Sequence, residues 1–163
     1  MKFKSSIFLL SVVSTSVLAS NPVMVGDVLG RDLGMFPASA GHVGIWDGSR
    51  VLEVLNKPTV IQKNSLSSFK NATEYWGARH GIGYNHHLMV TNGWDQRNYQ
   101  PQYTIGASYT VGGWKNENGR YTLVRGKFRC DTFVNYTYKS VLNRNLITWF
   151  TPNNLYNSFP SQR

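Results

Sequence analysis

Residues 41–54 read GHVGIWDGSRVLEV, in which two runs rich in β-branched and apolar residues flank an Asp-Gly pair. Asp-Gly is a preferred centre of the type I′ turn, which joins two antiparallel strands through a two-residue loop. Such a loop pairs Trp46 with Ser49 and, counting back along both strands, His42 with Glu53. Because directly opposed side chains have Cβ atoms roughly 4.5–5.5 Å apart, we expect an imidazole beside a carboxylate.

A helix is predicted over residues 131–142, where apolar residues recur at helical spacing: Phe133, Val134, Thr137, Val141 and Leu142. Asn135 and Lys139 fall on another face. Asp131 and Thr132 suit a first helical turn, which favours acids and short hydroxyls. Cys130 is thus placed at or just before the helix start, where the helix dipole favours the thiolate.

Cys130, His42 and Glu53 form a candidate catalytic set. If the helix packs with its start over His42, a thiol meets a base that a carboxylate orients, as in thiol acyl-transfer enzymes. The carboxylate would fix the tautomer of the imidazole and stabilise the imidazolium, and the backbone N–H of Cys130 would face a developing oxyanion. The alternatives are an ordinary cross-strand pair and a buried, inert thiol.

The first nineteen residues resemble a secretory signal. Lys2 and Lys4 precede an apolar stretch, and Val17-Leu18-Ala19 fits the small-residue rule for cleavage. We expect residues 1–19 to be removed and residues 20–163 to form a single exported domain, periplasmic or secreted; an uncleaved anchor is the alternative. The single cysteine then has no disulfide partner in an oxidising compartment, so it is either deeply buried or needed for chemistry.

The composition limits the classes of partner. The chain has 163 residues, 41% of them hydrophobic, which excludes wholesale disorder. Its 17 Lys and Arg outnumber its 8 Asp and Glu, and removing Lys2 and Lys4 leaves 15 − 8 = +7. This charge favours anionic partners such as peptidoglycan, acidic polymers or lipid headgroups. The basic residues form no dense run, so we expect no nucleic-acid binding.

The other polar candidates carry less weight. His80, His86 and His87 have no carboxylate or thiol at short ligand spacing, so we expect no metal and no cofactor. Gln96 could donate to an oxyanion, although a loop glutamine is more often solvated. Asp27 is read as a turn or strand-start residue.

Elsewhere the pattern is weaker. Strands are expected at 26–29, 74–79, 103–105 and 121–124, with a short helix at 65–69 and an irregular tail over 143–163.

Four pieces of the chain together resemble a known family: GDV at 26–28, GHVGIW at 41–46, VLE at 51–53 and FRCDTFV at 128–134. They look like the circularly permuted NlpC-type cysteine hydrolases, which include YaeF/YiiX-like proteins and, more distantly, lecithin retinol acyltransferase-like enzymes. The resemblance covers residues 25–55 and 126–142. It implies a small α+β, permuted papain-like domain whose antiparallel sheet packs against the helix that starts at the cysteine. Cys130 would be the nucleophile, His42 the base and Glu53 the third polar residue, while residues 56–125 would shape the substrate groove.

The main functional hypothesis is an exported cysteine hydrolase that cleaves amide bonds in cell-wall peptide. A thiol-dependent lipid or ester hydrolase or acyltransferase is the first alternative. A non-catalytic envelope-binding module with an inert Cys130 is the second.

Overall fold

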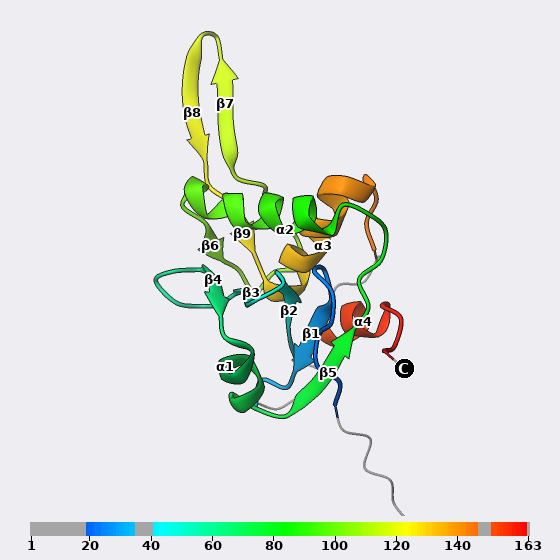
Figure 1. The fold of residues 1–163 in the computed structure, drawn as a ribbon. Helices are drawn as coiled ribbons and strands as arrows, with labels where there is room; N and C mark the ends of the chain where they lie inside the picture. Colours follow the sequence, from blue (N-terminus) through cyan, green and yellow to red (C-terminus); the bar gives the residue numbers. More distant parts are fainter. Residues whose placement is uncertain (1–18, 35–40, 147–150, 163) are drawn as a thin grey trace, which may run out of the picture.

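The computed structural model describes residues 19–34, 41–146 and 151–162. Apart from Ala19, the expected leader at 1–19 lies outside the described residues. Figure 1 shows a central sheet flanked by helices, with one long hairpin projecting from the body. None of the described helices is long and apolar enough to cross a membrane.

A five-stranded antiparallel sheet forms the centre of the molecule. Its strands are β1 (Val28–Arg31), β2 (His42–Trp46), β3 (Val51–Val54), β4 (Ile61–Asn64) and β5 (Tyr75–Arg79), arranged in the order β4-β3-β2-β1-β5. Neighbouring strands pair antiparallel throughout. The expected α+β fold class with an antiparallel sheet is therefore confirmed.

Helices cover both faces of this sheet. On one face Val43, Ile45 and Leu52 share a core with α3 (Cys130–Leu142), α2 (His86–Asp95) and α4 (Pro152–Asn157). On the other face Leu29 and Val51 pack against Phe69 of α1 (Leu66–Asn71). Because both faces are covered, β1 and β3 are buried along their whole length, with no alternation of buried and exposed residues.

The predicted two-residue hairpin loop is wrong. Trp46 pairs with Val51, so residues 47–50 form a four-residue loop. Asp47 explains the difference, because its carboxylate accepts the N–H groups of Ser49 and Arg50 at 2.8 and 2.6 Å. An aspartate that bonds to its own following backbone makes an Asx turn, and this turn replaces the type I′ geometry.

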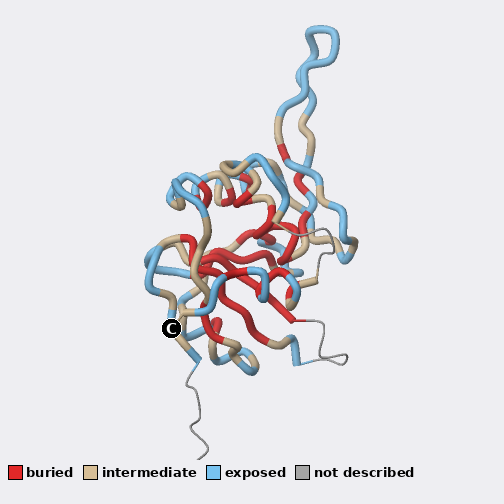
Figure 2. The backbone as a smooth tube through the Cα atoms, turned by 90° about the vertical axis from the view of Figure 1, so that its right-hand side faces the viewer, coloured by how far each residue is buried: buried red, intermediate tan, exposed pale blue. Residues whose placement is uncertain are grey.

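A second hairpin lies outside the sheet. It consists of β7 (Gly113–Glu117) and β8 (Arg120–Val124), joined at Asn118-Gly119 with positive φ at both residues. Figure 2 shows it projecting from the body, exposed over most of its length. At its base are the 3₁₀ turn η1 (Gln96–Tyr99) and a short parallel pair, β6 (Gln102–Tyr103) with β9 (Lys127–Phe128). β9 leads directly into α3.

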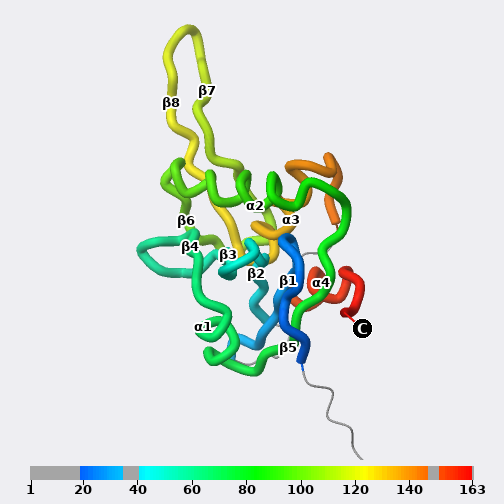
Figure 3. Tube along the Cα trace, viewed as in Figure 1, coloured from blue at the N-terminus to red at the C-terminus, as the bar shows by residue number. Residues whose placement is uncertain are grey.

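Several local predictions are confirmed and one is wrong. The short helix at 65–69 is α1, capped by the Ser65 hydroxyl, and the strand at 74–79 is β5. The tail expected to be irregular contains α4, which starts with Thr151 as N-cap and Pro152 in the first turn. Figure 3 traces the chain from the first described residues, in blue, to the last ones, in red. Both described ends lie beside β5, where Ala78 N–H donates to the Ser20 carbonyl and His80 N–H to that of Pro160.

Candidate active site

Cys130 is the first residue of α3, as the sequence predicted, and is 3% exposed. Two side chains fix this helix start. The Arg129 N–H donates to the Thr132 hydroxyl at 2.9 Å, and the Thr132 N–H donates to the buried Asp131 carboxylate at 2.8 Å. Bonds of this kind satisfy the first N–H groups of a helix. The thiol therefore has a defined position at the positive end of α3.

His42 and Glu53 contact each other directly, although not by the predicted pairing. Nε2 of His42 lies 2.7 Å from Oε2 of Glu53, and both residues are buried. Continuing the observed register places Gly44 opposite Glu53, so His42 is one diagonal step away. The four-residue loop shifts the register by two residues. Since side chains alternate with a period of two, the pair stays on one face of the sheet.

Glu53 has two further partners that sequence reasoning did not find. Asn64 of β4 donates to Oε1 of Glu53 at 2.7 Å, and Nη2 of Arg31 in β1 lies 3.6 Å from Oε2. Arg31 is opposite His42 in the register of β1 with β2. The pairing of β1 with β2 was the only signal that could have indicated Arg31. Finding Asn64 would also have required predicting that β4 pairs with β3.

These contacts decide the charge of Glu53. Burial alone raises the pKa of its carboxyl, but the hydrogen bond and charge of His42, the hydrogen bond from Asn64 and the charge of Arg31 lower it below its ordinary value. Glu53 is therefore an anion at neutral pH, held by three polar side chains.

The imidazole of His42 also contacts the thiol. Burial alone lowers the pKa of His42. The charge of Cys130 as a thiolate, hydrogen bonds with Cys130 and Glu53, and the charge of Glu53 together outweigh burial and raise this pKa from 6.5 to about 9. Because Nε2 is engaged by Glu53, Nδ1 is the ring nitrogen that faces the thiol. The structure thus brings together all three predicted site residues.

A cavity of about 210 Å³ opens onto this group, and Cys130, His42 and Gly41 line it. Its other walls come from distant parts of the chain: Leu33, Tyr103, Arg129, Thr151 and Pro152. Burial and the charge of Cys130 both raise the pKa of Tyr103. Residues from the middle segment and the tail therefore complete the site.

Arg129 is fixed at the rim of this cavity. Its guanidinium binds Asp131 through two hydrogen bonds of 2.7 Å and donates a third, at 2.9 Å, to the carbonyl of Ile105. A bidentate Arg–carboxylate pair has strict geometry, so the position of the Arg129 guanidinium in the cavity wall is fixed.

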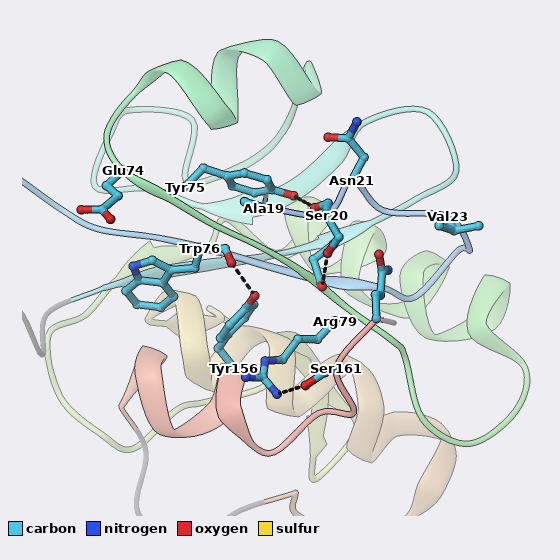
Figure 4. A pocket seen from close by; sticks show the side chains of 12 residues that line it. Ala19, Ser20, Asn21, Val23, Glu74, Tyr75, Trp76, Arg79, Tyr156 and Ser161 are labelled. Carbon is cyan, nitrogen blue, oxygen red and sulfur yellow. Dashed lines mark hydrogen bonds between the residues drawn. The ribbon is translucent and has the colours of Figure 1, made fainter. Parts of the chain in front are cut away.

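A larger cavity, about 700 Å³, lies elsewhere, beside β5 (Figure 4). Its polar side chains hold the chain ends in place: Tyr75 donates to the Ser20 carbonyl and Tyr156 to the Trp76 carbonyl, while Arg79 binds Ser161. Neither Cys130 nor His42 lines it. We interpret it as the seam where both chain ends pack against β5.

The remaining polar candidates have structural contacts. Asp27 accepts the N–H groups of residues 23, 24 and 81 and the side chain of Gln162, and His80 faces it at 3.6 Å. Gln96 is buried, donates to Tyr136 and accepts the Gly112 N–H at 2.7 Å, so it anchors the base of the β7–β8 hairpin. His86 bonds to the Ile82 carbonyl. In the described parts of the chain, no three His, Cys, Asp or Glu side chains gather as a metal site.

No protein-family model, curated protein or solved structure matches the chain. A thiol at a helix start, an imidazole that bonds to it and a buried carboxylate on the other ring nitrogen line one small cavity.

Proposed function

We propose that the protein is a cysteine hydrolase in which Cys130 is the nucleophile, His42 the acid and base, and Glu53 the orienting carboxylate. One observation carries this proposal: a single buried imidazole bonds to Glu53 at 2.7 Å and to the thiol at the start of α3. Such an arrangement is the geometric signature of an activated nucleophile.

In the first half-reaction the Cys130 thiolate attacks the substrate carbonyl carbon. The helix start leaves its first N–H groups without intrahelical acceptors, so the Cys130 N–H is positioned to stabilise the oxyanion. The His42 imidazolium then gives its proton to the leaving nitrogen. The C–N bond breaks, and a thioester with Cys130 and a free amine result.

In the second half-reaction the neutral His42 takes a proton from water as that water attacks the thioester carbonyl. The C–S bond breaks, the carboxylic acid product leaves, and the thiolate–imidazolium pair is restored. Glu53 remains ionised throughout and holds the ring in place. The net reaction consumes one amide and one water and gives one acid and one amine.

Amide bonds are the substrate class that this site fits best, because an amine leaving group must be protonated as it departs. An imidazolium with a pKa of about 9 stays protonated across neutral pH. The predicted export and the net charge of +7 after leader removal favour an anionic polymer outside the cytoplasm. We therefore propose the peptides of peptidoglycan as the substrate.

A second candidate, a thiol-dependent lipid or ester hydrolase or acyltransferase, uses the same three residues. Apolar side chains of Leu33, Tyr103 and Pro152 in the wall of the cavity favour it. The permuted papain-like architecture remains part of the proposal, since it explains why the histidine strand precedes the cysteine helix.

The test is digestion of purified peptidoglycan by wild type and Cys130→Ala, with separation of the released muropeptides. We expect new fragments carrying a free amine and a free carboxyl group, and none with Cys130→Ala. Phospholipids, assayed in parallel, report fatty acid release. Release from lipid alone would favour the second candidate. No product from several wall types or from lipid, with a thiol that resists alkylation, would favour a non-catalytic envelope-binding module.

A further inference from the structure

The β7–β8 hairpin presents its two faces to solvent with different chemistry. Trp114 pairs with Leu123 and Asn116 with Tyr121, so the two aromatic residues and the leucine share one face. Lys115 pairs with Thr122 and Glu117 with Arg120, which places the charged residues on the opposite face. We call the face that carries Trp114, Tyr121 and Leu123 the aromatic face.

Large apolar side chains are unusually exposed here. Trp114 is 64% and Tyr121 68% exposed. Val111, two residues before β7, is also exposed. A lone two-stranded hairpin is marginally stable in water unless something packs on it. Neighbouring exposed apolar residues of this kind mark interaction surfaces.

The hairpin is also basic. Between residues 110 and 127 there are four cations, Lys115, Arg120, Arg125 and Lys127, against one acid, Glu117, so the net charge is 4 − 1 = +3. All four cations are exposed. Glu117 forms an exposed ion pair with Lys115.

We propose that the β7–β8 hairpin docks this protein on the surface of an anionic phospholipid membrane. Trp and Tyr place an apolar ring and a polar atom at the boundary between headgroups and acyl chains. Nearby Lys and Arg residues are attracted to anionic headgroups. The aromatic face enters the interface, and the cations contact the lipid phosphates.

The separation of ring and charge favours a membrane over a polyanion in solution. A polymer such as a nucleic acid or an acidic glycan needs only cations to be attracted, and charge alone leaves Trp114, Tyr121 and Leu123 in water. A lipid interface provides an apolar layer and an anionic layer at once. The proposal does not depend on the thiol chemistry, since Cys130 takes no part in it.

The test is flotation of the purified protein with vesicles of phosphatidylglycerol and phosphatidylcholine, or of phosphatidylcholine alone. A Cys130→Ala background removes any turnover. We expect binding to the anionic vesicles, weakened about tenfold or more by Trp114→Ala with Tyr121→Ala, and about thirtyfold by Arg120→Gln with Arg125→Gln, which removes two cations. Any leader still attached contributes equally to all variants, so the comparison remains valid.

Matched controls are Tyr84→Ala, an aromatic residue 63% exposed outside the hairpin, and Lys57→Gln, an exposed cation elsewhere. Both are expected to bind like the parent, and circular dichroism should show the same fold in every variant. Equal flotation of the hairpin variants and the controls would overturn the proposal. So would binding to isolated peptidoglycan with no binding to either vesicle.

Discussion

Arg31 is the residue whose importance the sequence conceals most. Its guanidinium lies 3.6 Å from Glu53 and stacks on Phe69, 4.9 Å from the ring centroid. It is nine-tenths buried, and the charge and ring contacts of its guanidinium are with Glu53 and Phe69. We therefore regard Arg31 as a positioning residue that stabilises the Glu53 anion.

We predict that Arg31→Met lowers the free energy of unfolding by about 1–3 kcal/mol at neutral pH, because it removes one partner of a buried anion. The direction in which this difference in unfolding free energy changes with pH follows from the shifted pKa of Glu53. The pKa of Glu53 is lowered in the folded protein, so its contribution is present above the ordinary value of 4.5 and is lost as the pH falls through the folded value. The stability gap between wild type and Arg31→Met should therefore narrow on acidification.

Urea denaturation between neutral and acidic pH measures this gap. Arg31→Lys keeps the charge and should recover most of the difference. A gap that is constant with pH, or Arg31→Lys behaving like Arg31→Met, would mean that Arg31 acts only through packing on Phe69.

The pKa of His42 leads to a second prediction at the residue scale. Leaving-group protonation requires the imidazolium, so kcat/KM of the wild type should fall as the pH rises through about 9. Glu53→Gln removes the charge, which helps to raise this pKa, so the alkaline limb should move to lower pH. The rate at neutral pH should also fall, by about a hundredfold or more.

A pH–rate profile of both proteins on the same peptide substrate provides the measurement. An alkaline limb at the same pH in wild type and Glu53→Gln would show that Glu53 does not support the imidazolium.

At the scale of elements, the start of β2 depends on a glycine. A Cβ on Gly41 would lie 1.8 Å from the Trp76 ring, which also covers Gly30. The indole N–H of Trp76 donates to Asp32 at 2.8 Å, so the ring cannot swing away without losing that bond. Gly41 directly precedes His42 and lines the cavity.

We predict that Gly41→Ala lowers the free energy of unfolding by about 1–3 kcal/mol. Because the substitution displaces His42, we also expect the folded variant to hydrolyse peptide more slowly than the wild type. Gly113→Ala is the matched control, since nothing lies within 4 Å of its added Cβ. Thermal unfolding and peptide hydrolysis check both variants. If Gly41→Ala has the same unfolding temperature and the same rate of hydrolysis as Gly113→Ala, position 41 at the start of β2 does not require glycine.

The same scale shows which predictions local sequence can support. The two strands of 41–54 and the helix start at Cys130 were predicted from turn chemistry and periodicity, and both are present. The loop length was wrong because the Asp47 side chain selects an Asx turn, which dipeptide preference does not reveal. α2 was missed because its sequence, HHLMVTNGWD, has little amphipathic pattern. α4 was missed because it is short, and the Thr151-Pro152 pair at its start is the only sequence signal that indicates a helix there.

At the scale of the whole molecule, the missing information was long-range packing. His42 and Cys130 are 88 positions apart in the sequence (130 − 42), and no local pattern indicates that α3 packs against β2. Tyr103 and Pro152 reach the cavity for the same reason, from segments that carried no recognisable motif. The residue types and their order in the sequence indicated the chemistry of the site. The residues that line the cavity could be identified only from the three-dimensional structure.

The proposed hydrolase requires His42 to activate the Cys130 thiol. The most direct test is the rate of iodoacetamide alkylation at Cys130 as a function of pH, in wild type and His42→Ala. We predict that iodoacetamide alkylates the Cys130 thiol of the wild type rapidly at neutral pH, and that His42→Ala slows this reaction at the same pH. Identical curves in the two folded proteins, or a thiol unreactive in both, would contradict the claim.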